Sequence, residues 1–199
     1  MVNSKTMNKE DLLEETTTNK LASSYLEILK NLGEDSSRDG LLKTPERVAK
    51  AMQYLTNGYS QDPVETLKSA LFKEDYSEPV LVKNMEFYSL CEHHMLPFFG
   101  RAHVAYIPNG HIVGLSKIPR LLEVFSRRLQ VQERLTDQMC QCLSETLNAK
   151  GVAVLIEAQH MCMQMRGVET QQSTTLTTSY RGVYTEDNKK QDFLQSLKL

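Results

Sequence analysis

Apolar residues recur at helical spacing early in the chain and predict two helices there. In residues 21–33 leucine, isoleucine and tyrosine stand three or four positions apart, and the pattern ends at a glycine. A second helix is expected from Thr44, because threonine can cap a helix and the following Pro45 suits its first position. Residues 1–18 are polar, rich in threonine and without periodicity, so we predict a mobile tail there.

Beyond Pro79 the pattern changes to short segments rich in Val, Ile, Phe and Tyr. Partial alternation predicts strands at 80–90, 101–107, 152–158, 160–166 and 174–184. Residues 117–149 have helical spacing, with a break expected between Arg128 and Gln132, where the apolar phase slips. A short helix at about 187–197 closes the sequence.

These elements predict an α+β fold, with helices in front and then mostly antiparallel strands around one long helix. We place the domain boundaries where the pattern changes. A helical region at 19–78 follows the tail, and a second domain occupies 79–199.

Composition and charge exclude several classes of protein. With 199 residues, 40% of them hydrophobic and 24% charged, the chain has enough apolar side chains to form a core. The net charge of −2 argues against a general nucleic-acid or membrane-surface binder. No apolar run approaches the roughly 18 residues of a membrane helix, and the N-terminus lacks a secretory signal. We expect a cytoplasmic or nuclear location, where the cysteines stay reduced and serve as ligands, nucleophiles or core residues.

A cysteine and two histidines within four residues, Cys91-Glu92-His93-His94, are the strongest chemical signal. The C-x-x-H spacing brings Cys91 and His94 to one side of a turn, which suits a single metal ion. Zinc needs three protein ligands at a catalytic site and four at a structural one. The other candidate ligands are His103, His111, Cys140, Cys142, His160 and Cys162.

Strand geometry favours Cys162 as the third ligand. If 160–166 is a strand, its side chains alternate. His160, Cys162, Gln164 and Arg166 then share a polar face, and Met161, Met163 and Met165 share a face suited to the core. Cys140 and Cys142 lie two apart on a helix and point about 200° apart, so core packing is expected for them.

Three ligands leave the fourth zinc position for water, which is the catalytic pattern. Zinc lowers the pKa of its bound water to about 7, and His93 and His160 would then be free for proton transfer. Two alternatives stay open. One is a closed structural zinc site with His93 or His160 as fourth ligand, and the other is a pair of buried thiols without a metal.

Basic residues at the start of the long helix suit an anion. Ser116, Lys117 and Arg120 stand where free N–H groups and the helix dipole attract phosphate, and Arg166 could join them. A solvated helix start is the alternative.

Three further charged residues are weaker signals. Arg47 and Lys50, three apart on the second helix, more simply form a surface face. Glu133 lies at the helix break, where a carboxylate could accept two hydrogen bonds from a guanine-like edge. An ion pair with a neighbouring arginine is the simpler interpretation of Glu133.

Taken together, these motifs resemble GTP cyclohydrolase I. The resemblance rests on CEHH (91–94), GLSKIPR (114–120), QVQERLT (130–136), HMCMQMRG (160–167) and LLKTPERVAKAM (41–52). It covers about residues 20–199 with the motifs in the family order. The residues of the segments SRRLQVQERLT and MCMQMRGV are more similar to the eukaryotic branch of the family than to the bacterial branch.

The resemblance implies roles for the residues at the matching positions. Zinc is the implied cofactor, with Cys91, His94 and Cys162 as its ligands. The proton-transfer residues are His93 and His160, and Ser116 serves the later sugar rearrangement. The implied substrate contacts are Glu133 at the guanine edge, Gln132 in the purine pocket, Lys117, Arg120 and Arg166 at the triphosphate, and Arg47 and Lys50 reaching it from a neighbouring subunit.

The resemblance also implies a fold, an assembly and a reaction. The fold is the tunnelling fold, an antiparallel sheet with two helices packed on it, preceded by an N-terminal helical region. The assembly is a homodecamer with active sites at subunit contacts, and whether a feedback regulatory protein also binds is left open. The reaction is GTP plus water giving formate and 7,8-dihydroneopterin triphosphate, for folate or tetrahydrobiopterin synthesis.

Three alternatives remain at this point. A related tunnelling-fold enzyme reduces a nitrile on a deazapurine, but it uses a cysteine nucleophile without the zinc ligands. A non-catalytic, zinc-stabilised binding module would need a fourth protein ligand. A regulatory or degenerate paralogue is disfavoured, because every matching functional position is intact.

Overall fold

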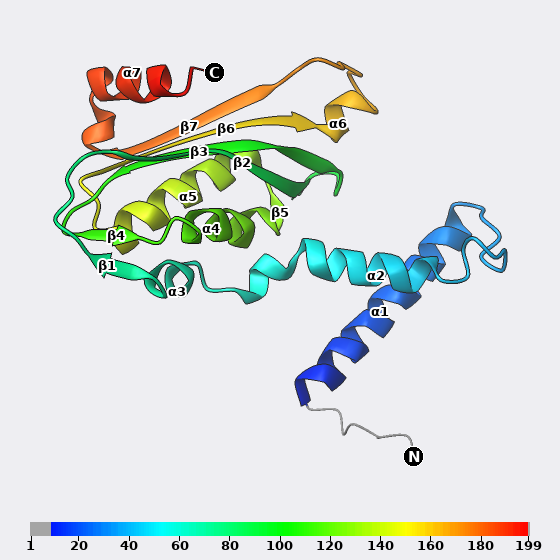
Figure 1. Ribbon diagram of the computed structural model, residues 1–199. Helices are drawn as coiled ribbons and strands as arrows, with labels where there is room; N and C mark the ends of the chain where they lie inside the picture. The colour runs from blue at the N-terminus through cyan, green and yellow to red at the C-terminus, as the bar shows by residue number, and fades with distance from the viewer. Residues whose placement is uncertain (1–8, 199) are drawn as a thin grey trace. The chain divides into compact units, whose positions relative to one another are not determined.

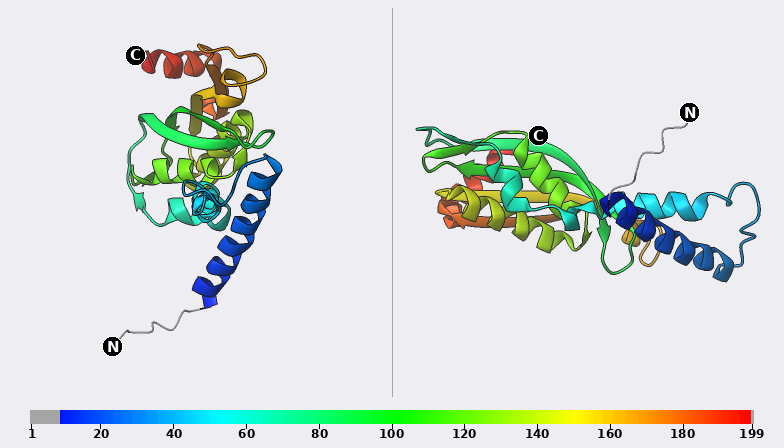
Figure 2. Two further views of the ribbon diagram at one scale, coloured as in Figure 1. Left: turned by 90° about the vertical axis from the view of Figure 1, so that its right-hand side faces the viewer. Right: turned by 90° about the horizontal axis from the view of Figure 1, so that it is seen from below.

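The computed structural model describes residues 9–198 of the chain (Figures 1 and 2). It divides into two compact units, Met1–Leu55 and Thr56–Leu199. The second unit therefore begins before Pro79, where the change of pattern placed the boundary. Residues 1–8 of the predicted tail lie outside the part of the chain that the structure describes.

The first unit is a pair of helices, α1 (Lys9–Asn31) and α2 (Thr44–Leu55). The helix α1 includes residues 9–18, so the second half of the predicted tail is helical instead. Packing explains the difference, because Thr18 is buried and its hydroxyl donates a hydrogen bond to Gln53 Oε1 of α2 at 2.8 Å. Contact with a neighbouring helix here outweighs the poor helix propensity of threonine.

A main sheet with strand order β5-β2-β3-β6-β7 forms the centre of the second unit (Figure 1). Its antiparallel strands are β2 (Val80–Cys91), β3 (Pro97–Ile107), β6 (Gly151–His160) and β7 (Thr175–Gly182). The short β5 (Leu129–Gln130) pairs parallel to the end of β2. This arrangement confirms the predicted α+β class and is consistent with the tunnelling fold.

Two helices cover one face of this sheet, α4 (Lys117–Ser126) and α5 (Gln132–Leu147). The expected break in the long helix is confirmed, since β5 lies between them. The core fills the space between these helices and the sheet, with Phe98, Val104, Leu122, Leu143 and Ile156 among its buried members. The C-terminal helix α7 (Asp187–Ser196) packs on the opposite face, where Phe193 joins a second apolar cluster (Figure 1).

Short elements complete the second unit. They are η1 (Asn57–Ser60), α3 (Pro63–Lys68), β1 (Leu71–Lys73), β4 (His111–Val113), α6 (Met161–Gln164) and η2 (Val183–Thr185), with β1 and β4 paired as a small sheet. The Asp62 side chain caps α3 by accepting from the backbone N–H groups of Val64 and Glu65, and Pro63 occupies its first turn.

The predicted strand at 160–166 is wrong beyond His160, where the chain turns into α6. The cause is the length of the neighbouring strand. His160 pairs with Phe98, one residue from the start of β3 at Pro97, so β6 has no partner to continue along. The methionines consequently do not form a core face, and Met165 is 64% exposed.

Candidate active site

Three predicted zinc ligands from two separate segments come together at one end of the sheet. Cys91 ends β2, His94 lies in the turn to β3, and Cys162 lies in α6. Their candidate ligand atoms all lie within 4.8 Å of one another. Backbone hydrogen bonds fix the turn, from Met95 N to Cys91 O at 2.7 Å and from Cys91 N to Leu96 O at 2.9 Å.

The donor set fits zinc. Two thiols and one imidazole are among its preferred ligands, and three protein ligands leave one coordination position open. Burial and the neighbouring Cys91 raise the pKa of the Cys162 thiol, so a cation is needed to hold two thiolates so close together. Among the described residues, neither His93 nor His160 belongs to this ligand group, which disfavours the closed structural site.

The ring of His160 is held on two sides at the end of β6. It stacks parallel on Phe98, with centroids 4.8 Å apart and planes at 1°. Its Nε2 lies 2.8 Å from the side-chain oxygen of Gln132. Burial lowers the pKa of His160, and the negative charge of Glu133 opposes that shift.

His93 has a looser environment than His160. It is exposed, and its Nδ1 lies 3.7 Å from Cys91 Sγ. An exposed imidazole beside a metal ligand is placed to exchange protons with a substrate or with water.

The first turn of α5 contacts His160 through Gln132. Glu133 is exposed, and the described residues include no ion-pair partner for it, contrary to the simpler interpretation of this residue. Gln132 is 1% exposed, and its amide bonds to protein groups rather than facing an open pocket.

Sequence reasoning missed an ion pair between Glu92 and Arg134. Both guanidinium Nη groups of Arg134 donate to the carboxylate of Glu92, in a forked pair. Arg134 thereby lowers the pKa of Glu92. The pair joins α5 to the turn that carries His93 and His94, although Glu92 looked like an ordinary turn residue. No sequence signal connects two residues 42 positions apart.

The predicted phosphate-binding residues are divided in space. Arg166 lies at the metal group, with Nη1 3.0 Å from His94 Nε2. Ser116, Lys117 and Arg120 lie at the start of α4. Cys91 pairs with Gln130, just beyond the other end of α4, and a helix of ten residues is about 15 Å long. One copy of the chain therefore does not bring these three residues to its own metal group.

The remaining candidates are structural or belong to the first unit. Arg47 and Lys50 are exposed on α2, where Lys50 pairs with Glu46. His103 is buried and its Nδ1 accepts from Asn84 N, outside the ligand group. Cys140 and Cys142 are buried in the core, as expected.

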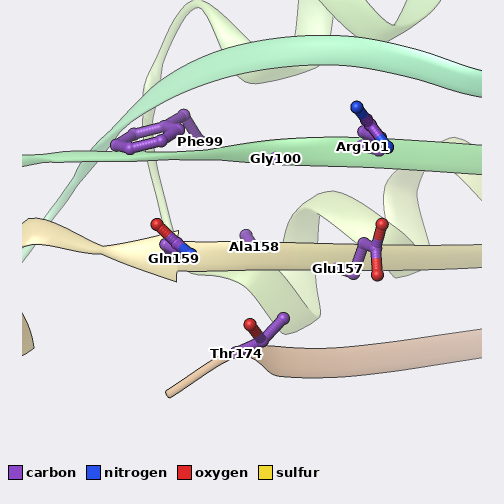
Figure 3. Close-up of a pocket in the computed structure, with 7 residues that line it drawn as sticks. All are labelled: Phe99, Gly100, Arg101, Glu157, Ala158, Gln159 and Thr174. Carbon is purple, nitrogen blue, oxygen red and sulfur yellow. The ribbon is translucent and has the colours of Figure 1, made fainter. Parts of the chain in front are cut away.

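A separate hollow of about 330 Å³ lies over β3 and β6 (Figure 3). Gly100 lines it, and a Cβ at this position would lie 1.9 Å from Glu157 O, so a glycine is required where β3 and β6 approach so closely. Phe99 and Gln159 line it. Their neighbours Phe98 and His160 point to the other face of the sheet by strand alternation. The hollow holds no cysteine or histidine and is distinct from the metal group.

No helix in the described part of the chain is long and apolar enough to cross a membrane.

Comparison with known proteins agrees with this chemistry. The sequence model of the family described as GTP cyclohydrolase I matches residues 21–198. The protein named GTP cyclohydrolase 1 in Porphyromonas gingivalis strain W83 is 57% identical over 184 residues, covering 92% of this chain and 95% of the relative. The same name is carried by relatives in Bacteroides thetaiotaomicron (60% identical over 174 residues; 87% and 89% covered) and Chlorobaculum tepidum (60% over 169 residues; 84% and 75% covered).

These relatives are bacterial, so they lend no support to the expected likeness to the eukaryotic branch. Among solved structures, the archaeosine synthase QueF-Like in the apo form aligns with a TM-score of 0.41 and 15% identity, over 52% of this chain and 93% of that one. That likeness is too weak to bear on the fold. The match of the family model over nearly the whole sequence, together with the bacterial relatives, makes this chain a member of the GTP cyclohydrolase I family.

Proposed function

We propose that this protein is a zinc enzyme that converts GTP and water into formate and 7,8-dihydroneopterin triphosphate. The observation that carries the proposal is the convergence of Cys91, His94 and Cys162 in a chain of this family, with His160 two residues before Cys162. The product would enter folate or tetrahydrobiopterin synthesis.

Each group at the site has a proposed role. Zinc, when bound by the three ligands, would supply a Lewis acid that activates water for attack on the purine ring. Glu133, exposed and without an ion-pair partner among the described residues, would accept hydrogen bonds from the guanine edge. His160 and His93 would move protons during opening of the purine and of the ribose, a contribution typically of about 10²–10⁴-fold in rate.

The triphosphate is proposed to bind between subunits. Arg166 would contact it from the chain that carries the metal ligands. Lys117 and Arg120 would reach it from a neighbouring chain, because they lie at the far end of α4 from their own metal group. Ser116 would act in the later sugar rearrangement from the same helix start.

This division favours a homo-oligomer, and we propose the decamer that the family resemblance implies. Arg47 and Lys50 of α2 would add positive charge to the triphosphate site of another subunit. A feedback regulatory protein is a further proposed partner. We propose a cytoplasmic location, because Cys91 and Cys162 must stay reduced to bind a metal.

A turnover assay on zinc-loaded protein tests the proposal. Formate and pterin fluorescence are followed together, with and without a zinc chelator. Appearance of both products, and loss of both on zinc removal, is the expected result. Stoichiometric zinc with no GTP turnover by the assembled protein would overturn the proposal in favour of a binding module.

A further inference from the structure

The side chain of Gln132 has its orientation set by the backbone around it. It is 1% exposed at the start of α5. Its Nε2 lies 3.1 Å from Ile156 O and 2.9 Å from Thr175 O, on two adjacent strands. Both partners are carbonyl oxygens, which only accept hydrogen bonds. The amide nitrogen must therefore face them, and the amide oxygen must face the other way.

That oxygen faces His160. Gln132 Oε1 lies 2.8 Å from His160 Nε2, and an amide oxygen only accepts. Nε2 of His160 must then carry a hydrogen. In a neutral imidazole the remaining lone pair lies on Nδ1, so the hydrogen bond selects one of the two tautomers.

We propose that Gln132 is a positioning residue. It holds His160 as the Nε2–H tautomer, so that Nδ1 is the nitrogen that exchanges a proton with the substrate. The proposal rests on the proposed function of this site, and it replaces the expected role of Gln132 as a purine contact. Its buried amide is bonded to protein through both its nitrogen and its oxygen.

The arrangement suits a group that accepts and returns one proton. When Nδ1 takes a proton from the reacting ring, the ring becomes imidazolium and Nε2 keeps its hydrogen bond to Gln132. When Nδ1 releases that proton, the starting tautomer is restored. The Phe98 ring keeps the plane of the imidazole fixed through both steps. No other reorganisation is required of the side chain.

The chain offers a matched control in Gln130. Gln130 is also a buried glutamine, 2% exposed, and its Nε2 also donates to a backbone carbonyl, Phe125 O at 3.0 Å. It makes no hydrogen bond to a histidine among the described residues. Gln132→Met and Gln130→Met therefore remove comparable buried amides, and only the first releases His160.

The kinetic test compares the two variants as zinc-loaded assemblies. We expect Gln132→Met to lower kcat by about 10–100-fold, within the range of general acid–base catalysis. Its KM for GTP and its zinc content should be unchanged, and Gln130→Met should keep the wild-type kcat. A raised KM with an unchanged kcat in Gln132→Met would overturn the proposal and support a purine contact.

A spectroscopic test reads the tautomer of His160 in the wild-type protein without turnover. Nitrogen-15 spectra of histidine-labelled, zinc-loaded wild-type protein are recorded at a pH where the imidazoles are neutral, and the His160 signal is assigned by its loss in His160→Gln. The expected signal is that of a protonated Nε2 and a bare Nδ1. A protonated Nδ1 would overturn the proposal. Absence of turnover with the expected tautomer would instead count against the proposed function alone.

Discussion

Phe98 stacks on His160 and also belongs to the core. Its effect on kcat and its effect on the free energy of unfolding can therefore be measured separately. Phe98 is fully buried, lies parallel to His160 at 4.8 Å and meets Phe87 edge-on at 5.9 Å. Phe98→Leu keeps an apolar side chain but removes both ring contacts. Aromatic pairs contribute about 0.5–1.5 kcal/mol each beyond their buried area, so the free energy of unfolding should fall by about 1–3 kcal/mol.

The same substitution should impair catalysis. Without the Phe98 ring the imidazole of His160 can tilt, and a misplacement of about 1 Å can cost on the order of 10²-fold in rate. We therefore expect a large loss of kcat with an unchanged KM for GTP. Phe87→Leu is the control, since Phe87 is buried and contacts Phe98 but not His160. It should cost about 0.5–1.5 kcal/mol of stability and leave kcat unchanged.

Two measurements decide the matter. Urea unfolding followed by circular dichroism gives the stability of each variant, and formate release at saturating GTP gives kcat. Equal kcat values for Phe98→Leu and the wild type would refute the idea that stacking orients His160. So would an equal loss of kcat in Phe87→Leu, because the effect would then follow core stability rather than the stacked ring.

Three further predictions concern the metal group and the fold. Cys162→Ser should abolish stoichiometric zinc binding, measured by metal analysis after gel filtration, while the far-ultraviolet circular dichroism stays that of the wild type; retained zinc would mean that Cys162 is not a ligand. Glu92→Arg or Arg134→Glu should each weaken zinc binding in a chelator competition, and the double reversal should recover part of the loss; no recovery would show that the pair does not support the ligand turn. Asp137 accepts hydrogen bonds from a serine and an arginine of β7, which lower its pKa, so its stabilising effect is present at neutral pH and is lost as the pH falls through that lowered pKa. Asp137→Asn should therefore be less stable than the wild type at pH 7 and equal to it under strongly acidic conditions, and a pH-independent difference in melting temperature would contradict this.

Local pattern predicted most of the main sheet, because its strands are rich in Val, Ile, Phe and Tyr with partial alternation. The break between α4 and α5 was also predictable, since the apolar phase slips between Arg128 and Gln132. The short elements α3, β1 and β4 were not predicted, because a few residues carry too little periodicity. The start of α1 at Lys9 was missed for another reason, since contact with α2 overrides local propensity.

The three predicted ligands converge in the structure, but the geometric argument for one of them was wrong. Cys162 was selected by strand alternation, whereas it lies in a helical turn after His160. The end of β6 depends on where β3 begins, a fact about pairing that residues 160–166 do not contain. Likewise the bond between Gln132 and His160 joins residues 28 positions apart, and only the packed sheet brings them together.

The segment at the helix break organises the whole site, which gives the phase slip a functional reason. The backbone of Gln130, which Gln130→Met would keep, pairs with the strand that ends in Cys91, and its carbonyl accepts a hydrogen bond from Glu92 N in the ligand turn. Gln132 turns inward to hold the active-site histidine, while Glu133 points outward into solvent. Arg134 reaches back to the carboxylate of the ligand turn. A continuous helix would place residues three or four apart on one face. Here a short strand is followed at once by the start of a helix, so consecutive side chains point in different directions. Residues 130–134 can therefore support the turn that carries the metal ligands and orient His160. They also present the carboxylate of Glu133 to the substrate.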